Sequence, residues 1–317
     1  MATPNILVTS CAAKVPLLVA LRGALDADAP DGVLWGADLD PDCVGRFFSD
    51  RFWAMPPIDC EGAADALVAF CERERIGLLV PTRDGELSTL ATLRDRLAER
   101  GTYAAIGSPE SIETCLDKVA FAHHCTRHGI PTPPLESAAE AIPGDRLVVK
   151  ERRGAGSRSV AVDANRATAA RFAEGLDEPV FQSFAPGVEH SIDCYVNFEG
   201  DLIEAAPRAR VRVRDGESTV TETVEHPALV AVARTLAKTL DLRGHFVVQA
   251  FAEGDRVSVI ECNARVGGAS TLGFVAGVDT PRWALAEARG EPVVPRIGTY
   301  QRGLRLVRYA ADLLIET

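Results

Sequence analysis

A short motif near residue 261 combines side chains that suit a metal ion and a phosphate group. Glu261, Asn263 and Arg265 are spaced two residues apart and follow an apolar, β-branched run. Because side chains alternate along a strand, we expect these three to point one way, and Ile260 and Cys262 to point the other. A carboxylate and an amide oxygen suit Mg²⁺, and an arginine suits phosphate. The motif indicates either a magnesium–phosphate site or a polar strand end facing solvent.

A second strand strengthens the metal interpretation. Residues 244–251 are apolar except for a few positions, one of which is Gln249, and the turn Glu253-Gly254-Asp255 joins them to the motif strand. Two antiparallel strands joined by a short turn place Gln249 across from Glu261 and Asn263. Three oxygen-bearing side chains would then surround one point, and water and phosphate oxygens would complete an octahedral Mg²⁺ shell.

A lysine and a glycine-containing segment point to phosphate as well. Lys150 ends the apolar strand 147–150, and a lysine in such a run needs an anionic partner. The residues that follow include Gly154 and Gly156 among three arginines. Glycines allow the backbone to approach an anion, so that N–H groups can hold phosphate oxygens. The alternative is an ordinary hairpin.

Four arginines alternate with small and apolar residues over 208–214, namely Arg208, Arg210, Arg212 and Arg214. On a strand they would share one face, where four like charges repel unless anions answer them. The anions could belong to a substrate, to a triphosphate or to the protein's own carboxylates.

The first 110 residues alternate between strand patterns (5–9, 33–37, 78–80) and helix patterns (15–25, 63–75, 87–100). This order predicts a parallel, Rossmann-like sheet, although the first turn lacks the glycine signature of dinucleotide binding. Loops after such strands meet at the carboxyl edge of the sheet, where ligands bind, and the alternative for their side chains is a capping or solvated role. The residues expected there are Ser10, Lys14, Arg83, Asp84 and Glu86.

The rest of the chain is richer in strands. We expect one helix over 111–128, a Gly/Pro linker over 129–134 and a helix over 227–240. Strands are expected over 147–150, 159–162, 180–184, 189–198, 202–214, 244–251 and 256–260, with a last one over 309–317.

Bulk properties restrict the class of protein. The chain has 317 residues and a net charge of -11, which argues against a nucleic-acid partner because phosphate backbones require a basic surface. No apolar stretch approaches the roughly 20 residues of a membrane span, and the N-terminus lacks a signal-peptide pattern. We therefore expect a cytoplasmic protein with no membrane partner.

Taken in order, these motifs resemble the ATP-grasp superfamily, most closely the branch of the carbamoyl-phosphate-synthetase large subunit. The resemblance rests on Lys118, Lys150, the 154–157 loop, Glu189, Gly216-Glu217-Ser218, Gln249 and Glu261-x-Asn263-x-Arg265. It implies an α/β and α+β fold, in which an N-terminal Rossmann-like pre-ATP-grasp domain (1–112) precedes a two-lobed ATP-grasp fold. The small lobe would span 113–180 and carry the Gly-rich loop, and the large lobe would span 181–317 and carry the Mg–ATP site.

The resemblance also implies roles for individual residues. The cofactor ATP would have its phosphates held by Lys118 and Lys150, and a loop with Gly154, Gly156 and Ser157 would close over them. A hinge would offer backbone groups to adenine; it consists of Gln182, Ser183, Phe184 and Ala185. Glu189 would bind the ribose. Two Mg²⁺ ions, with Mn²⁺ as a substitute, would be bound by Gln249, Glu261 and Asn263. The expected catalytic residues are Arg265, Asn263 and Arg210.

The family's chemistry implies an ATP-dependent carboxylate–amine ligase. A small-molecule carboxylate would attack the γ-phosphate, and an amine substrate would then attack the acyl phosphate to form an amide or peptide bond. Two alternatives are a carboxyphosphate former or kinase that needs a partner subunit, and a nucleotide-binding protein without turnover. A homodimer is the assembly that the family's habit suggests.

Overall fold

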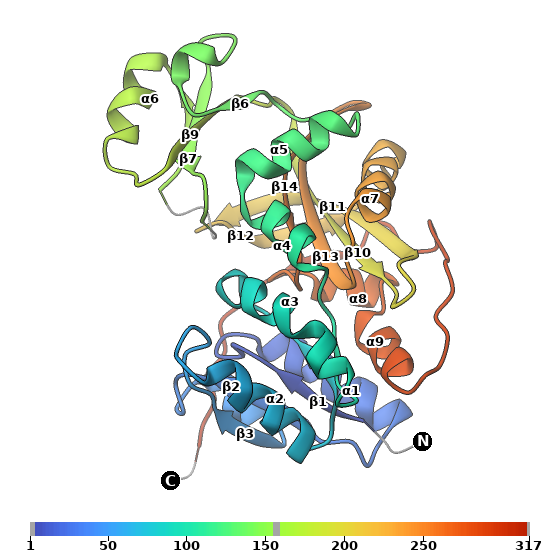
Figure 1. Cartoon of the computed structure of the whole chain (residues 1–317). Coiled ribbons are helices and arrows are strands. Elements are labelled where there is room, and N and C mark those ends of the chain that lie inside the picture. The colour runs from blue at the N-terminus through green and yellow to red at the C-terminus, as the bar shows by residue number, and fades with distance from the viewer. Residues whose placement is uncertain (1–3, 155–158, 316–317) are drawn as a thin grey trace.

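The described residues form three sheets that occupy separate parts of the molecule (Figure 1). The structure is a computed structural model and describes residues 4–154 and 159–315. Gly156 and Ser157 of the predicted phosphate loop lie outside the described residues. The N-terminal sheet lies at the bottom of Figure 1, a small sheet at the top, and the largest sheet between them on the other side of the central helices.

The N-terminal sheet is parallel, as the sequence predicts, with the strand order β3-β2-β1-β4-β5. Its elements are β1 (Asn5–Val8), α1 (Val15–Asp28), β2 (Leu34–Asp38), β3 (Arg51–Ala54), α2 (Ala63–Arg73), β4 (Ile76–Val80), α3 (Asp84–Ala98) and β5 (Tyr103–Ala104). Ile6 and Val8 pack with α1, whereas Leu7 packs with α2 and α3, so β1 is buried on both faces. The strand order reverses at β1, and the loops after β1 and β4 therefore lie side by side at the carboxyl edge.

Two helices, not one, connect this sheet to the rest of the chain. The helix predicted over 111–128 is divided into α4 (Pro109–Leu116) and α5 (Lys118–Arg127). Asp117 between them has a non-helical backbone, and its Oδ1 accepts hydrogen bonds from the N–H groups of Val119 (2.9 Å) and Ala120 (3.2 Å). Such capping begins a new helix. Lys118 consequently occupies the first turn of α5.

The small sheet is antiparallel, in the order β6-β9-β7-β8, and has a core of its own. It is built from β6 (Leu135–Glu136), β7 (Leu147–Glu151), β8 (Ala161–Ala164), α6 (Arg166–Ala173) and β9 (Pro179–Ser183). Leu147, Val149, Ala169 and Phe181 pack together apart from the other large clusters. The strand β9 continues across residue 180, and the division of the chain at 112/113 and 180/181 stays a prediction.

The large antiparallel sheet has the order β14-β13-β10-β11-β12-β15. Its elements are β10 (Val188–Val196), β11 (Leu202–Arg214), β12 (Glu217–Thr223), α7 (Pro227–Thr239), β13 (Gly244–Glu253), β14 (Arg256–Asn263), α8 (Thr271–Ala276), α9 (Thr280–Ala288) and β15 (Arg305–Val307). The helix α9 packs against α1, and Tyr195 and Trp283 share one apolar cluster with Ile6. The large sheet and the N-terminal sheet are thus joined by continuous cores, which the small sheet does not share.

The structure corrects two sequence-based predictions in this part of the chain. The last strand is β15 (Arg305–Val307), and no strand occurs over the described residues 309–315. The pairing of β11 with β12 shifts between Arg210 and Arg212, so the four arginines do not share one face. Arg208 and Arg210 are buried, whereas Arg212 and Arg214 are exposed. An irregularity in pairing breaks the simple alternation that the prediction assumed.

Candidate functional site

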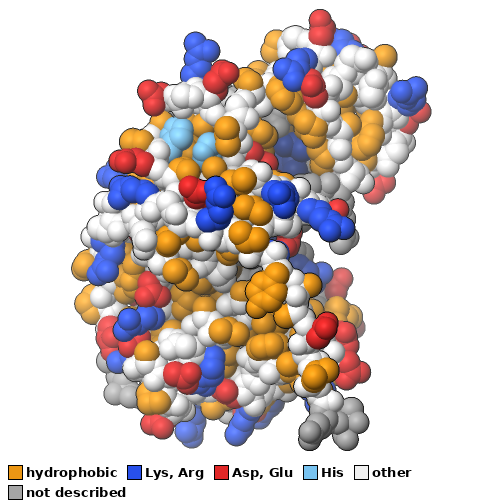
Figure 2. Space-filling view, turned by 180° about the vertical axis from the view of Figure 1, so that it is seen from behind, with side chains coloured by type: hydrophobic (Ala, Val, Ile, Leu, Met, Phe, Trp, Pro, Cys, Tyr) orange, Lys and Arg blue, Asp and Glu red, His pale blue; other side chains and the backbone are white. Residues whose placement is uncertain are grey.

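A cavity of about 330 Å³ lies between the small sheet and the large sheet. The space-filling view shows the molecule hollowed beside the small sheet, with basic side chains at the hollow (Figure 2). The apolar walls come from both sheets and are formed by Val148, Val160, Val162, Phe184, Phe251 and Ile260. The polar side chains that line it include Lys118, Lys150, Glu189, Gln249, Glu261 and Asn263. The cavity therefore combines apolar surface, which suits a flat ring, with two lysines, which suit phosphates.

Lys150 is buried within this cavity, as its place in an apolar strand predicts. Its side chain comes from β7, the residue is 7% exposed, and Nζ donates to Oε1 of Gln182 at 2.9 Å. Burial lowers the pKa of Lys150 to about 8, although Glu261 acts in the opposite direction. A lysine kept in such surroundings with one neutral hydrogen-bond partner is poised to gain an anionic ligand.

Lys118 reaches the stem of the Gly-rich segment. Its Nζ donates to the carbonyl of Gly154 at 2.9 Å, and burial lowers its pKa. The same stem is tied down by Arg152, whose Nε lies 2.9 Å from Oδ2 of Asp117, the cap of α5. The cap thus positions both Lys118 and the start of the predicted phosphate loop.

The predicted hinge residues line the cavity, but part of their backbone is already engaged. The N–H of Ser183 donates to the carbonyl of Pro134 (2.9 Å), and that of Phe184 donates to the carbonyl of Arg146 (3.0 Å). The guanidinium of Arg146 also lies 3.9 Å from the centre of the Phe184 ring. Recognition of a base by this segment would consequently fall to its carbonyls and to Ala185.

The three predicted metal ligands meet at one point. Gln249 pairs directly with Glu261 across β13 and β14, and Asn263 donates to Glu261 at 3.2 Å. Cys262 points into the core, as predicted. Ile260 does not, because the pairing shifts after Gln249 and brings Ile260 to the cavity beside Glu261.

The amide groups around Glu261 show what its carboxylate attracts. The Gln249 amide is best satisfied with its nitrogen donating to Glu261 and its oxygen accepting from Nη1 of Arg210 at 2.9 Å. Asn263 also turns its nitrogen to Glu261. Glu261 thus receives donors from two neighbours, and an Mg²⁺ ion would have to displace these donors and draw the amide oxygens instead.

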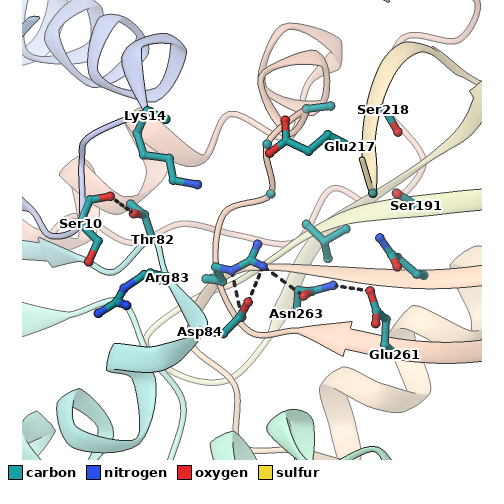
Figure 3. A pocket seen from close by; sticks show the side chains of 18 of the residues that line it. Ser10, Lys14, Thr82, Arg83, Asp84, Ser191, Glu217, Ser218, Glu261 and Asn263 are labelled. Atoms are coloured by element: carbon teal, nitrogen blue, oxygen red, sulfur yellow. Dashed lines mark hydrogen bonds and ion pairs between the residues drawn. The ribbon is translucent and has the colours of Figure 1, made fainter. Parts of the chain in front are cut away.

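A second, larger cavity of about 790 Å³ adjoins the first and shares Gln249, Glu261 and Asn263 with it. Its far wall is the carboxyl edge of the N-terminal sheet, where Ser10, Lys14, Arg83 and Asp84 lie as predicted (Figure 3). The fifth residue expected there, Glu86, is fully buried and accepts hydrogen bonds from Thr9, Ser10 and Thr82. Glu86 therefore has a structural role, which was the alternative for this residue.

Arg265 connects the two walls of the larger cavity. Its Nε and Nη2 donate to the two carboxylate oxygens of Asp84 at 2.9 and 2.7 Å, and Nη2 also lies 3.2 Å from Oδ1 of Asn263. Sequence reasoning named both Arg265 and Asp84 but not their pairing, because 181 positions separate them. The predicted catalytic arginine is thus held in place by an acid of the N-terminal sheet.

The two buried arginines of β11 form ion pairs with the protein's own carboxylates, which is one of the three alternatives that the sequence left open. Nε of Arg208 donates to Asp193 at 2.8 Å, and Nη1 of Arg210 donates to Glu189 at 2.5 Å. Burial raises the pKa of Glu189 despite Arg210. Both guanidiniums still line the larger cavity. Glu189, expected to hold a ribose, is therefore also the partner of a predicted catalytic residue.

Asp193 is a residue that sequence reasoning missed. It is fully buried, and it accepts from Ser270 (2.6 Å) as well as from Arg208. Burial alone would raise its pKa, but Arg208 and the nearby His245 hold the pKa well below the usual range. Its position between Ile192 and Cys194 in an apolar strand was the available signal, since an isolated acid there needs a partner.

Among the residues that the structure describes, no helix combines the length and the apolar character that crossing a membrane requires.

Two family models match the chain. The model described as "ATP-grasp in the biosynthetic pathway with Ter operon" matches residues 177–311, and the model described as "PylC-like, N-terminal domain" matches residues 6–105. No curated protein sequence matches. The matched segments include the hinge, Glu189 and the proposed metal ligands in one model, and Lys14 and Asp84 in the other.

Solved structures share the fold over nearly the whole chain. The biotin carboxylase domain of 2-oxoglutarate carboxylase from Hydrogenobacter thermophilus, a dimer with MgADP, ADP and bicarbonate, has a TM-score of 0.75 at 15% identity. The match covers 96% of this chain and 74% of that one. Biotin carboxylase from Campylobacter jejuni has a TM-score of 0.73 at 17% identity, with 95% and 74% covered. N5-carboxyaminoimidazole synthetase from Staphylococcus aureus, with ADP, has a TM-score of 0.72 at 14% identity, with 93% and 79% covered.

Proposed function

Because the chain belongs to the ATP-grasp superfamily of ATP-dependent ligases, we propose that it joins a small carboxylate to an amine through an acyl phosphate, releasing ADP and phosphate. The observation that carries the proposal is the junction of two cavities at Glu261, Asn263 and Gln249. One cavity has the walls and lysines that a nucleoside triphosphate requires. The other is polar and large enough for small substrates.

In this proposal ATP occupies the smaller cavity. The adenine ring lies between the apolar walls near Phe184, and Glu189 faces the ribose. Lys150 and Lys118 hold the phosphates, which supply the anionic partner that both side chains lack among the described residues. We propose that Gly154, Gly156 and Ser157 bind the phosphates; Gly156 and Ser157 lie outside the described residues.

The donor set at the junction fits magnesium. A carboxylate and two amides are hard oxygen ligands, and Mg²⁺ needs few protein ligands because water and phosphate oxygens fill the remaining positions. Glu261, Asn263 and Gln249 would hold the metal, which when bound would neutralise charge on the phosphates. Glu261 already accepts hydrogen bonds from the amides of Asn263 and Gln249, so the three side chains are close enough to hold one ion once both amides turn their oxygens toward it. The use of two ions, and of Mn²⁺ in place of Mg²⁺, belongs to the proposal as well.

The reaction needs no nucleophilic side chain from the protein. A carboxylate oxygen of the substrate bonds to the γ-phosphorus while the bond from that phosphorus to the β–γ bridging oxygen breaks, and ADP leaves with the electron pair. The amine nitrogen then bonds to the acyl carbon, the carbon–oxygen bond to phosphate breaks, and the amine releases a proton. Arg265, oriented by Asp84, and Lys150 stabilise the charge on the transferring group.

A substrate screen tests the proposal. The protein is incubated with ATP, Mg²⁺ and pools of amino acids, other small carboxylates and bicarbonate, and ADP, phosphate and product mass are measured. Hydroxylamine in place of the amine should yield a hydroxamate if an acyl phosphate forms. ADP formation with bicarbonate alone would favour the carboxyphosphate alternative, and nucleotide binding without turnover on any pool would contradict the ligase proposal.

A substitution at the proposed metal site tests the assignment of Glu261. Glu261→Gln keeps the size of the side chain and one acceptor oxygen but removes the charge that Mg²⁺ needs. We expect ADP formation to fall by at least about 100-fold, with circular dichroism and the melting temperature close to those of the wild type. Wild-type turnover by this variant would show that Glu261 is not a metal ligand. Sedimentation of the same samples tests the proposed homodimer.

A further inference from the structure

The larger cavity contains cationic groups that the proposed chemistry leaves without a partner. Most charged side chains that line it are paired within the described residues. Four ion pairs involve these side chains: Asp84 with Arg265, Arg208 with Asp193, Arg210 with Glu189, and Glu217 with Arg308. The remaining acids accept hydrogen bonds from neutral donors: Asp38 and Glu151 from backbone N–H groups, and Glu261 from Asn263. Among the described residues, Lys14 and Arg83 have no carboxylate within ion-pair distance.

These two cations differ in their surroundings. Arg83 is exposed, so water can solvate its guanidinium. Lys14 is half-buried, and burial and Arg265 lower its pKa although the carboxylates of Glu217, Asp84 and Glu86 act in the opposite direction. In Figure 3 the Lys14 side chain extends into the open pocket. A desolvated, unpaired ammonium costs stability, and a ligand that supplies a negative charge removes that cost.

The backbone around Lys14 is built to hold it there. It ends the turn after β1, where its N–H donates to the carbonyl of Cys11 at 2.9 Å. Ser10 in this turn has a positive φ of 51°, which is unusual for a residue other than glycine, and its hydroxyl donates to Glu86 at 2.7 Å. A strained backbone that is held by a buried acid is typical of a functional turn.

We propose that the carboxylate substrate carries a second anionic group, a carboxylate or a phosphate, and that Lys14 binds this group. The proposal rests on the proposed function, because the first carboxylate must lie near Glu261 and Asn263 to meet the γ-phosphate. Glu261 lines both cavities, whereas Lys14 lines only the larger one, on its N-terminal-sheet wall. The second anion therefore binds away from the junction of the two cavities and serves to select and orient the substrate.

Binding measurements with matched ligands test the assignment. Calorimetric titrations in the presence of MgADP compare glutamate with glutamine and O-phosphoserine with serine, since each pair differs in one anionic group. We expect the wild type to bind one of the anionic members more tightly than its neutral counterpart, by at least about tenfold, as for a hydrogen bond to a charged group. Preference within the first pair identifies a carboxylate, and preference within the second identifies a phosphate.

Three variants separate recognition from structure. Lys14→Met should remove the preference by weakening the anionic ligand about tenfold or more, with the neutral ligand unchanged. Lys14→Arg keeps the charge and should keep the preference. Lys238→Met removes an exposed lysine of α7, outside both cavities, and should change nothing.

Failure of this inference and failure of the proposed function give different results. No preference within either pair, or equal weakening of both members by Lys14→Met, overturns the assignment of Lys14 even if neutral carboxylates support ADP formation. A preference that depends on Lys14, without turnover on any carboxylate, supports the anion site and contradicts the ligase reaction.

Discussion

Replacing Lys150 with methionine should stabilise the protein while abolishing its binding of nucleotide. The pKa of Lys150 is lowered from 10.5 to about 8 by burial. A decrease of this size means that the buried positive charge lowers the free energy of unfolding at pH 7 by about 3 kcal/mol. Methionine has a similar length and no charge, so it removes this penalty.

The loss of one hydrogen bond reduces the expected increase in the free energy of unfolding. Oε1 of Gln182, a residue that is 3% exposed, accepts from Lys150 and would be left without this donor. An unsatisfied buried acceptor costs roughly 1–3 kcal/mol. We therefore expect Lys150→Met to raise the free energy of unfolding at pH 7, without nucleotide, by up to about 2 kcal/mol.

The pH dependence gives a second measure of the same charge. Since the folded-state pKa is lowered, the unfolded chain binds more protons than the folded chain between pH 8 and 10.5. The contribution of Lys150 therefore makes the wild type more stable as pH rises through this window, and Lys150→Met should lack that contribution. Urea unfolding at several pH values measures both effects.

Two comparisons make the test decisive. Lys238→Met removes an exposed charge and should change the free energy of unfolding by less than about 0.5 kcal/mol. MgATP should raise the melting temperature of the wild type and of Lys238→Met, but not that of Lys150→Met. Destabilisation of the nucleotide-free protein by Lys150→Met would refute the reasoning, because Lys150 would then be a structural residue rather than one held for a phosphate.

Two other predictions concern the acidic side chains of Glu189 and Glu287. Arg210→Ala should raise the Michaelis constant for ATP and lower the free energy of unfolding by about 2 kcal/mol, because Glu189 of the proposed nucleotide cavity loses its partner. Steady-state kinetics and urea unfolding measure the two effects. An unchanged Michaelis constant for ATP would contradict the proposed role of Glu189 in binding ribose. Burial raises the pKa of Glu287 from 4.5 to about 7, so the stabilisation from its protonated form is complete below pH 4.5 and is lost as pH rises through 7. Glu287→Gln should remove this decline of up to roughly 3 kcal/mol, and equal pH profiles of both proteins in urea unfolding would show that Glu287 does not titrate in this window.

The elements that the sequence predicts well are those with an uninterrupted pattern. The strands β1, β2 and β4 are nearly continuous apolar runs, and they lie where the sequence predicts them. The hairpin of β13 and β14 also forms as predicted, but unbroken pairing from its turn would place Ile260 opposite Gln249, and the register shift after Gln249 brings Glu261 there instead. Asp117 shows where such reasoning fails. It lies within a continuous helical pattern, and only its backbone shows that it ends one helix and caps the next.

The prediction that the four arginines of β11 share one face is wrong for a different reason. Alternation predicts one face for all four, but a shift in pairing after Arg210 separates the buried pair from the exposed pair. The answering acids, Asp193 and Glu189, lie on the neighbouring strand β10. Sequence alternation describes one strand at a time, whereas the partners of a buried charge are set by the adjacent strand.

The two cavities differ in how much of them a motif can reveal. The proposed nucleotide cavity is lined by Lys118, Lys150 and Glu261, whose spacing in the sequence is what resembles the superfamily. The larger cavity takes one of its walls from turns of the N-terminal sheet, where Lys14 and Asp84 lie because the strand order reverses at β1. Since Asp84 also holds Arg265, the N-terminal sheet both positions the arginine that we propose to be catalytic and carries Lys14, the cation that we propose binds the substrate. The resemblance assigns no role to Lys14, so this proposal comes from an unpaired charge at the edge of the sheet rather than from a motif.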